Sequence, residues 1–351
     1  RTYSTKNTII EYNTITNSGY CGIVFSGDGA IVRYNYIDNY GLYKADAGGI
    51  YTSSQTGLNN MVIDHNTVLN GIQSNETNGL PLGTVSNKQY NIYLDYGAIY
   101  GYTITNNTAA HCQGGGGIML HGSQNVKIAN NTVYDCAVGI RLQELDGLGY
   151  PSRNITMDNN VVFAKTLSQL CLLVRSTTND FNQYGTFSNN YYAKPVDNTN
   201  AFATLVNTWA NTYHNLASWQ SYTSLDASSH MSAQTIKNEN DLQFEFNTTA
   251  SPKTVSLNFP MIDAKGIKYT SSITLQPYSS AVLMRDQNPV VAELTKPVIT
   301  AFSIPDNYSS LTVPVNKFTV VYNKAVTGYI LTESASAPLA SDAGWNTTTP
   351  A

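Results

Sequence analysis

The sequence predicts an all-β protein whose longest part is a right-handed parallel β-helix, a solenoid of short strands stacked coil upon coil. Two recurring motifs and the composition lead to this prediction. A motif centred on asparagine recurs along the first half of the chain, and a short isoleucine-containing strand alternates with it. Charged residues make up only 12% of the 351 residues, so uncharged polar side chains must form most of the surface.

The asparagine motif consists of an apolar residue, two or three polar residues, the asparagine, and a β-branched or aromatic pair. Successive asparagines are 22, 31, 41, 24, 29 and 30 residues apart. The shortest spacing is the length of one coil with three short strands, and the longer spacings are the same coil with loops inserted. We expect a hydrogen-bonded ladder of amides at one turn of every coil, rather than residues that only form turns. Its members are Asn13, Asn35, Asn66, Asn107, Asn131, Asn160 and Asn190.

The second motif is a short strand whose side chains point alternately inward and outward. Its copies are GIVFS (22–26), GIYTS (49–53), NIYLD (91–95), GIMLH (117–121) and GIRLQ (139–143). The isoleucines should stack inward, so the outward residues form columns from coil to coil. These outward residues are Val24, Ser26, Tyr51, Ser53, Tyr93, Asp95, Met119, His121, Arg141 and Gln143.

In these two motifs, residues 1–195 resemble the pectate-lyase-like family of right-handed parallel β-helix proteins. The resemblance implies the fold more than the activity. Polysaccharide lyases, glycoside hydrolases, esterases, phage tailspikes and adhesins are all built on a similar fold.

The periodicity fades after the seventh asparagine, and four further segments are predicted. Residues 196–235 form a connector with a short helix, in which WQSYTSLDASS (219–229) resembles a segment that follows the β-helix in secreted bacterial carbohydrate-active proteins. Residues 236–287 are expected to form a small antiparallel β-sandwich, similar to the all-β module that closes many glycoside hydrolases. A linker at 288–297 leads to residues 298–351, which resemble a truncated immunoglobulin-like module of bacterial surface proteins.

Charge and hydropathy argue against several kinds of partner. The net charge is −4 and there is no run of lysine and arginine, so nucleic acid and anionic membranes are poor partners. No stretch of 18 apolar residues occurs, so no membrane span is predicted. Because the chain opens at Arg1 directly in a repeat, we expect a fragment or processed form. The polar but weakly charged composition predicts a secreted or cell-surface protein, and we expect a monomer.

No cofactor is expected. The four cysteines, Cys21, Cys112, Cys136 and Cys171, include no C-x-x-C pair, so no zinc site is predicted. Cys112 and Cys136 are 24 residues apart, about one coil, and are interpreted as two small buried side chains or as a stacked disulfide. Calcium binding through Asp28 in SGDGA is an alternative.

The candidate catalytic residues lie on or beside the outward columns and are Asp95, Asp46, Glu144, His121 and Arg141. Asp95 and His121 lie one coil apart, within reach of a hydrogen bond, so the pair could share a proton. Glycoside hydrolysis needs two carboxyl groups. Asp46 would form a close pair with Asp95, whereas Glu144, two coils away, would lie about 9–10 Å from it.

Three of the catalytic candidates also have a purely structural interpretation. Asp46 precedes Gly-Gly and would then cap a turn. Arg141 would form a surface salt bridge with Glu144 or Asp146. Asp95 would be an ordinary polar residue on a solvated sheet.

The candidate substrate-binding residues are Tyr51, Tyr93, Lys44 and His111. Tyrosine rings offer a flat, amphipathic surface on which sugar rings stack. Lys44 lies shortly before GIYTS, in KADAGGIY, and His111 lies shortly before GIMLH, in AHCQGGGGI.

We therefore expect a polysaccharide as the partner and a glycoside hydrolase as the favoured function. One alternative is a polysaccharide lyase, in which Lys44, His121 and Arg141 hold the carboxylate of a uronate. The other is a non-catalytic carbohydrate-binding adhesin or cell-surface stalk.

Overall fold

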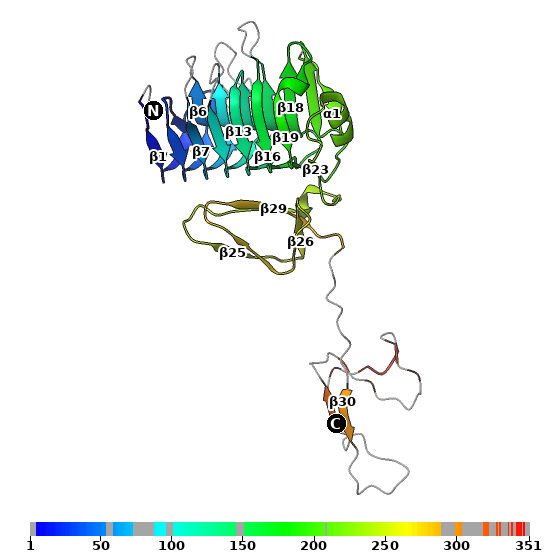
Figure 1. Ribbon diagram of the computed structural model, residues 1–351. Helices are drawn as coiled ribbons and strands as arrows, with labels where there is room; N and C mark the ends of the chain where they lie inside the picture. The colour runs from blue at the N-terminus through cyan, green and yellow to red at the C-terminus, as the bar shows by residue number, and fades with distance from the viewer. Residues whose placement is uncertain are drawn as a thin grey trace, which may run out of the picture. The chain divides into compact units, whose positions relative to one another are not determined.

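The computed structural model describes residues 5–53, 59–72, 88–95, 101–144, 151–207 and 209–288, the strands at 299–303 and 319–322, and scattered residues from 328 to 347. The chain divides into two units, Arg1–Pro289 and Val290–Ala351. The first unit opens with stacked parallel strands, which run side by side from blue to green in Figure 1. The all-β solenoid predicted from the repeats is therefore confirmed.

Three parallel sheets, here called sheets A, B and C, receive strands from successive coils. Sheet A contains β1 (Ile9–Glu11), β4 (Ile31–Arg33), β7 (Met61–Asp64), β10 (Tyr102–Thr105), β13 (Gln124–Ala129), β16 (Arg153–Asp158) and β19 (Gly185–Ser188). Sheet B contains β2 (Thr14–Ser18), β5 (Tyr36–Tyr40), β8 (Thr67–Gly71), β11 (Thr108–Cys112), β14 (Thr132–Tyr134), β17 (Val161–Phe163), β20 (Tyr191–Ala193) and β23 (His230–Met231). Sheet C contains β3 (Ile23–Val24), β6 (Ala47–Ser53), β9 (Gln89–Asp95), β12 (Gly116–His121), β15 (Val138–Gln143), β18 (Leu170–Ser176), β21 (Phe202–Val206) and the antiparallel β22 (Thr212–His214).

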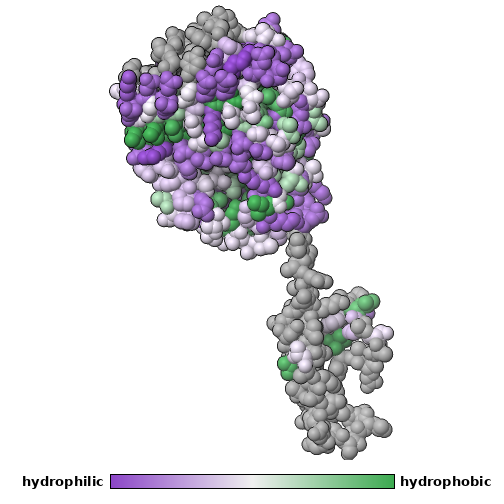
Figure 2. Space-filling view, in the orientation of Figure 1, coloured by the Kyte–Doolittle hydropathy of each residue, from purple (hydrophilic) through white to green (hydrophobic). Residues whose placement is uncertain are grey.

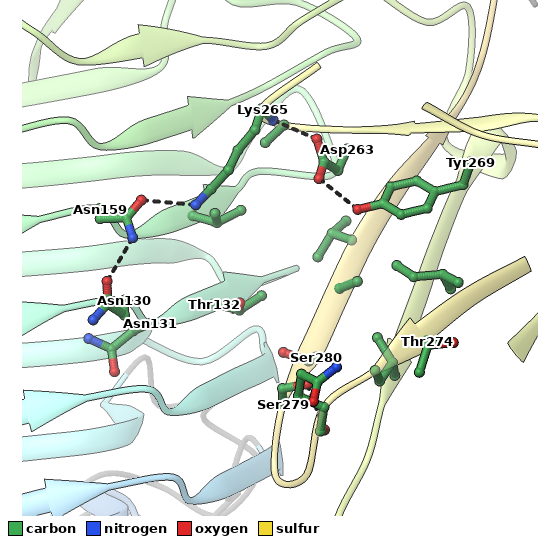
Figure 3. A pocket seen from close by; sticks show the side chains of 17 residues that line it. Asn130, Asn131, Thr132, Asn159, Asp263, Lys265, Tyr269, Thr274, Ser279 and Ser280 are labelled. Atoms are coloured by element: carbon green, nitrogen blue, oxygen red, sulfur yellow. Dashed lines mark hydrogen bonds between the residues drawn. The ribbon is translucent and has the colours of Figure 1, made fainter. Parts of the chain in front are cut away.

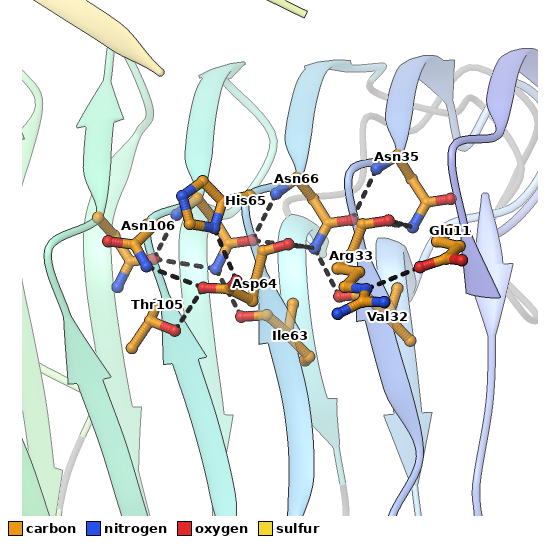
Figure 4. A network of polar contacts seen from close by, with 12 residues as sticks. Glu11, Val32, Arg33, Asn35, Ile63, Asp64, His65, Asn66, Thr105 and Asn106 are labelled. Atoms are coloured by element: carbon orange, nitrogen blue, oxygen red, sulfur yellow. Dashed lines mark hydrogen bonds and ion pairs between the residues drawn. The ribbon is translucent and has the colours of Figure 1, made fainter. Parts of the chain in front are cut away.

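The predicted asparagine ladder is present at the turn between sheets A and B, and Figure 4 shows the part around Asn35 and Asn66. Each amide Nδ2 donates to the Oδ1 of the asparagine in the next coil, over 2.9–3.0 Å. The same Oδ1 also accepts the backbone N–H of its neighbour, over 2.9–3.1 Å. The residue before each ladder asparagine has a left-handed backbone, with φ between 52° and 58°. This local turn directs the amide inward, where it satisfies buried backbone groups.

The isoleucines of the second motif stack inward as predicted. Ile23 pairs with Ile50, Ile50 with Ile92, Ile92 with Ile118, and Ile118 with Ile140. All five are at most 5% exposed and belong to one continuous apolar core.

The cysteines add small apolar side chains to this interior. Cys112 and Cys136 are buried and form no disulfide with each other, and Cys21 and Cys171 are buried thiols as well. The interpretation of Cys112 and Cys136 as two small buried residues therefore describes the structure, and the alternative of a disulfide does not.

The solenoid continues past residue 195, because β21 and β22 extend sheet C and β23 extends sheet B. The short helix α1 (Leu216–Thr223) lies in this part of the chain, and the 3-10 helix η1 (Phe181–Gln183) lies before it. The buried Trp219 of α1 donates through Nε1 to Asp226 (2.9 Å), and Asp226 also accepts from Asn190, the last member of the ladder (3.2 Å). The WQSYTSLDASS segment therefore caps the ladder, a structural role.

The segment 236–287 forms two small antiparallel sheets. Its elements are η2 (Glu239–Asp241), β24 (Leu242–Phe246), β25 (Lys253–Ser256), β26 (Met261–Asp263), β27 (Lys268–Tyr269), β28 (Ser272–Leu275) and β29 (Ser280–Arg285). One sheet has the order β24-β29-β26-β27 and the other pairs β25 with β28. We call this segment the antiparallel module. It shares one apolar cluster with sheet B, in which Ile262 and Met284 pack with Tyr134 and Phe163, so it belongs to the first unit.

In the second unit, β30 (Ile299–Ser303) pairs antiparallel with β31 (Thr319–Tyr322). Most of the segment 298–351 and of the linker at 288–297 lies outside the described residues, so the immunoglobulin-like module stays a prediction. No helix in the described part of the chain is both long enough and apolar enough to cross a membrane. Polar residues cover most of the visible face of the first unit, with apolar residues in small separate groups (Figure 2).

Candidate active site on sheet C

The outward columns of sheet C have the register predicted from the repeats. Tyr51 pairs with Tyr93, Tyr93 with Met119, and Met119 with Arg141. In the column two residues further along, Ser53 pairs with Asp95 and His121 with Gln143. Four consecutive coils therefore contribute to one face.

Asp95, the last residue of β9, accepts hydrogen bonds from three side chains. The Tyr51 hydroxyl donates to Oδ2 (2.9 Å), and the Tyr93 hydroxyl donates to Oδ1 (2.8 Å). His121 Nδ1 lies 3.1 Å from Oδ1. Burial alone would raise the pKa of Asp95, but the hydrogen bonds from these three partners outweigh it and the pKa is lowered. Asp95 is therefore an ionised, fully engaged carboxylate.

Asp46 lies directly before β6, at a residue with a left-handed backbone (φ 58°). Its Oδ1 lies 3.2 Å from the Tyr93 hydroxyl, the same hydroxyl that contacts Asp95. Burial raises the pKa of Asp46, and the negative charge of Asp95 raises it further. The two carboxyl groups therefore have pKa values displaced in opposite directions.

The Tyr93 hydroxyl explains how the two carboxyl groups can lie so close together. It carries one proton, which it can donate to only one of them. Both contacts are satisfied when a protonated Asp46 donates to the tyrosine oxygen and the tyrosine donates to Asp95. The two contacts limit the separation of these carboxyl oxygens to at most about 6 Å, which is below the ~6.5–9.5 Å of an inverting glycosidase pair and compatible with the ~5–5.5 Å of a retaining pair.

The tautomer of His121 follows from the residues on its far side. Arg141 donates through Nε (3.1 Å) and Nη2 (2.8 Å) to Oε1 of Gln143, which turns the amide nitrogen of Gln143 toward His121 Nε2 (3.4 Å). Because that nitrogen is a donor, His121 Nε2 must accept, and the ring proton lies on Nδ1, facing Asp95. Arg141 therefore acts on this face through Gln143 and His121.

Tyr93 does not offer the open ring expected of a sugar platform, whereas for Tyr51 that role stays a prediction. The Tyr93 ring is only 4% exposed and packs among Tyr51, Tyr90 and Met119. Burial and the charge of Asp95 raise the pKa of both Tyr51 and Tyr93, so their hydroxyls stay protonated as donors. Both side chains hold carboxyl groups, and the ring of Tyr93 has no open face for a sugar.

The hydrogen-bond partners of Glu144 lie outside this cluster. The side chain is buried and accepts from the backbone N–H (2.7 Å) and the hydroxyl (2.9 Å) of Thr177. Arg153 donates to its other oxygen over 3.2 Å. The salt bridge considered between Arg141 and Glu144 is absent, because Glu144 turns to Arg153 instead. Asp146 lies outside the described residues.

His111 belongs to a different sheet and a different cluster. It lies on β11 of sheet B, and its Nδ1 is 3.0 Å from Asp135 Oδ2. Its ring also meets Tyr134 and Phe244 edge-on. Lys44 is exposed, two residues before Asp46, and its side chain makes no hydrogen bond or ion pair with the described part of the chain.

Two residues of the site were not predicted from the sequence. Tyr20 donates through its hydroxyl to the backbone oxygen of Asp46 (2.8 Å), and Tyr90 packs against Tyr93 with ring centroids 4.6 Å apart. Burial raises the pKa of Tyr20 to about 12. Their only signal in the sequence is position, since each lies one or two residues before a copy of the strand motif.

No group of three or more histidine, cysteine, aspartate or glutamate side chains among the described residues could hold a metal ion. The calcium alternative rested on Asp28, whose Oδ1 accepts the backbone N–H of Asn59 over 3.0 Å. This contact ties two neighbouring turns together.

Comparison with known proteins supports the fold. Residues 70–210 match the family model described as "Right handed beta helix region". Searches of the curated proteins and of the solved structures produced no match. The stacked sheets and the family model agree that the chain contains a right-handed parallel β-helix region.

Proposed function

We propose that the protein is a glycoside hydrolase that cleaves a polysaccharide bound across the coils on the outer face of sheet C. The observation that carries the proposal is the pair Asp46 and Asp95, joined by one tyrosine hydroxyl and displaced in pKa in opposite directions. Glycoside hydrolysis needs one carboxyl group that is protonated and one that is ionised at the same pH.

The proposed roles follow from these opposite displacements of the two pKa values. Asp46 donates its proton to the glycosidic oxygen as the bond to the leaving sugar breaks. Asp95 acts from the opposite side of the anomeric carbon as the nucleophile, and His121 and Tyr51 keep it ionised and oriented. After the first product leaves, Asp46 takes a proton from water, and the water displaces Asp95. The short separation of the carboxyl groups favours this retaining course.

The resemblance noted from the repeats supports the choice of a polysaccharide, and so does the low charge of the chain. With a polar, weakly charged surface, we infer that the protein is secreted or displayed on the surface of a bacterial cell, as a monomer.

The test is hydrolysis of purified polysaccharides by the full chain and by two variants, Asp46→Asn and Asp95→Asn. Both variants should lose at least about a thousandfold in kcat/KM, since each removes a group of the reaction itself. Asp158→Asn is the matched control, because Asp158 also accepts from a hydroxyl and an amide but lies on sheet A. Full activity in either site variant would remove that residue from the mechanism.

Product analysis then separates the mechanisms. A retaining enzyme releases a sugar with the anomeric configuration of the substrate, which proton NMR detects within the first minutes. Release of the inverted anomer would contradict the nucleophilic role of Asp95.

A polysaccharide lyase is the second candidate, and Arg141 favours it. Among the described residues no carboxylate lies within ion-pair distance of this guanidinium, which contacts only Gln143. It is therefore available to a uronate carboxylate, with His121 Nε2 as the base. Products that absorb in the ultraviolet would favour elimination over hydrolysis, and binding without turnover would instead indicate an adhesin.

A further inference from the structure

A cavity of about 400 Å³ lies where the antiparallel module meets sheet B, away from the carboxyl pair on sheet C. Small-molecule sites have volumes of roughly 300–1,000 Å³, so the cavity has room for one or two sugar rings. Figure 3 shows Asn130, Asn159 and Thr132 on the side of the solenoid, facing Tyr269, Thr274 and Ser280 of the module.

The walls of the cavity are joined by contacts between the solenoid and the module. Lys265 Nζ donates to Asn159 Oδ1 (2.9 Å), and Asn159 Nδ2 donates to Asn130 Oδ1 (2.7 Å). The hydroxyls of Thr108 and Ser280 lie 2.7 Å apart. With the shared apolar cluster between these parts, the contacts form the cavity before any ligand arrives.

The two charged side chains of the lining, Lys265 and Asp263, already have hydrogen-bond partners within the protein. Lys265 is bound to Asn159, and its ammonium also lies 5.2 Å from the centre of the Tyr191 ring. Asp263 Oδ2 accepts the hydroxyl of Tyr269 over 3.1 Å. The lining therefore carries one charge of each sign and no net charge, which favours a neutral ligand over a strongly ionic one.

The remaining lining residues have the mixture of polar and apolar groups that suits the binding of a sugar. Apolar side chains, among them Val161 and Ile273, lie beside amides and hydroxyls. The Asn130 amide nitrogen and the Gln276 side chain have no hydrogen-bond partner in the described part of the chain. A sugar ring offers hydroxyl groups to such amides and C–H faces to apolar or aromatic side chains.

We propose that this cavity is a second carbohydrate-binding site, which takes a neutral mono- or disaccharide unit of a glycan. It does not rest on the glycoside hydrolase proposal, because no residue of the carboxyl pair lines it. Its role would be to hold a glycan between sheet B and the antiparallel module, independently of cleavage.

The test titrates cellobiose, xylobiose and mannobiose, with digalacturonate as the charged comparison, into full-chain protein labelled with ¹⁵N. The Asp95→Asn variant is used, so that turnover does not interfere. At millimolar concentrations at least one neutral disaccharide should shift the side-chain amide signals of Asn130, Asn159 and Gln276. Shifts confined to residues of sheet C, with none at Asn130, Asn159 or Gln276, would place the ligand on sheet C and would overturn the proposal.

Two pairs of variants locate the site. Thr132→Tyr should fill the cavity and abolish binding, whereas Thr14→Tyr, in the same outward column of sheet B but at the first coil, should bind normally. Asn130→Gly removes one amide at a left-handed residue without backbone strain and should weaken binding about threefold to tenfold, the effect of one neutral hydrogen bond. Asn106→Gly, at the equivalent residue one coil earlier, is its control.

Two results would refute the site. One is the absence of any amide shift with all three neutral disaccharides. The other is unchanged binding in both Thr132→Tyr and Asn130→Gly. Stronger binding of digalacturonate would overturn the assignment to a neutral sugar. If Thr132→Tyr does not fold, Asn130→Gly still decides the question.

Discussion

The asparagine ladder should be the most sensitive element of the solenoid, and Asn131 tests this directly. Its amide donates to Asn160 Oδ1 (3.0 Å) and to the backbone oxygens of Ile104 (2.9 Å) and Ala129 (3.1 Å). Its Oδ1 accepts both the backbone and the side-chain N–H of Asn107 (2.9 and 3.0 Å). Replacement by alanine removes five hydrogen bonds at a buried residue.

The cost can be estimated from these bonds. Each bond contributes about 0.5–1.5 kcal/mol, and partners left buried without a substitute cost more. We therefore expect Asn131→Ala to lower the free energy of unfolding by about 3–5 kcal/mol. Asn13→Ala at the exposed first coil loses only two side-chain bonds and should cost about 1 kcal/mol or less.

Urea unfolding of the full chain, followed by circular dichroism, measures the difference. Asn131→Asp is a second variant, because a carboxylate keeps the acceptor but cannot donate to Asn160. It should also be destabilised. If Asn131→Ala lost no more stability than Asn13→Ala, the ladder would not carry the energy assigned to it.

Three further predictions concern single side chains. Tyr93→Phe removes a hydrogen bond to the ionised Asp95, so kcat/KM should fall about 10- to 100-fold. Because the lost bond stabilises the carboxylate, the acidic limb of the pH–rate profile should move to higher pH. An unchanged profile would contradict the bridging role of Tyr93. In ¹⁵N NMR spectra of the wild type, His121 should carry its proton on Nδ1. The variant Gln143→Glu should carry protons on both ring nitrogens of His121. An Nε2–H tautomer in the wild type would refute the orientation of Gln143. Hydrogen bonds outweigh the effect of burial and lower the pKa of Asp135 to about 2. The ionised Asp135 therefore stabilises the folded state above pH ~4. This contribution, about 2 kcal/mol, is lost as the pH falls toward 2. Asp135→Asn should flatten that part of the stability curve in acid unfolding experiments.

Much of the solenoid could be predicted from the sequence, because the information is repeated at every coil. The ladder residues recur before a β-branched or aromatic pair, and the isoleucine strands recur at one phase. In a strand side chains alternate between two faces, so each inward isoleucine determines which of its neighbours point outward. For this reason the pairing of Tyr51 with Tyr93 and of His121 with Gln143 was correct.

The roles of individual side chains depended on tertiary contacts that the repeat does not contain. Tyr93 was correctly placed in its column, yet its hydroxyl reaches Asp46, a residue outside the column. Glu144 follows a site strand in sequence, but Arg153 and Thr177 engage it. His111 precedes a strand of sheet C, but it lies on sheet B.

The sequence by itself determined the solenoid, its ladder and the residues that share a face, since these depend on period and on strand alternation. Only the tertiary structure decided which carboxyl groups meet, where the connector ends and how the antiparallel module closes a cavity against sheet B. The physical reason is that long side chains and corner residues with left-handed backbones direct polar atoms across coils. Their directions depend on neighbours that are distant in the chain.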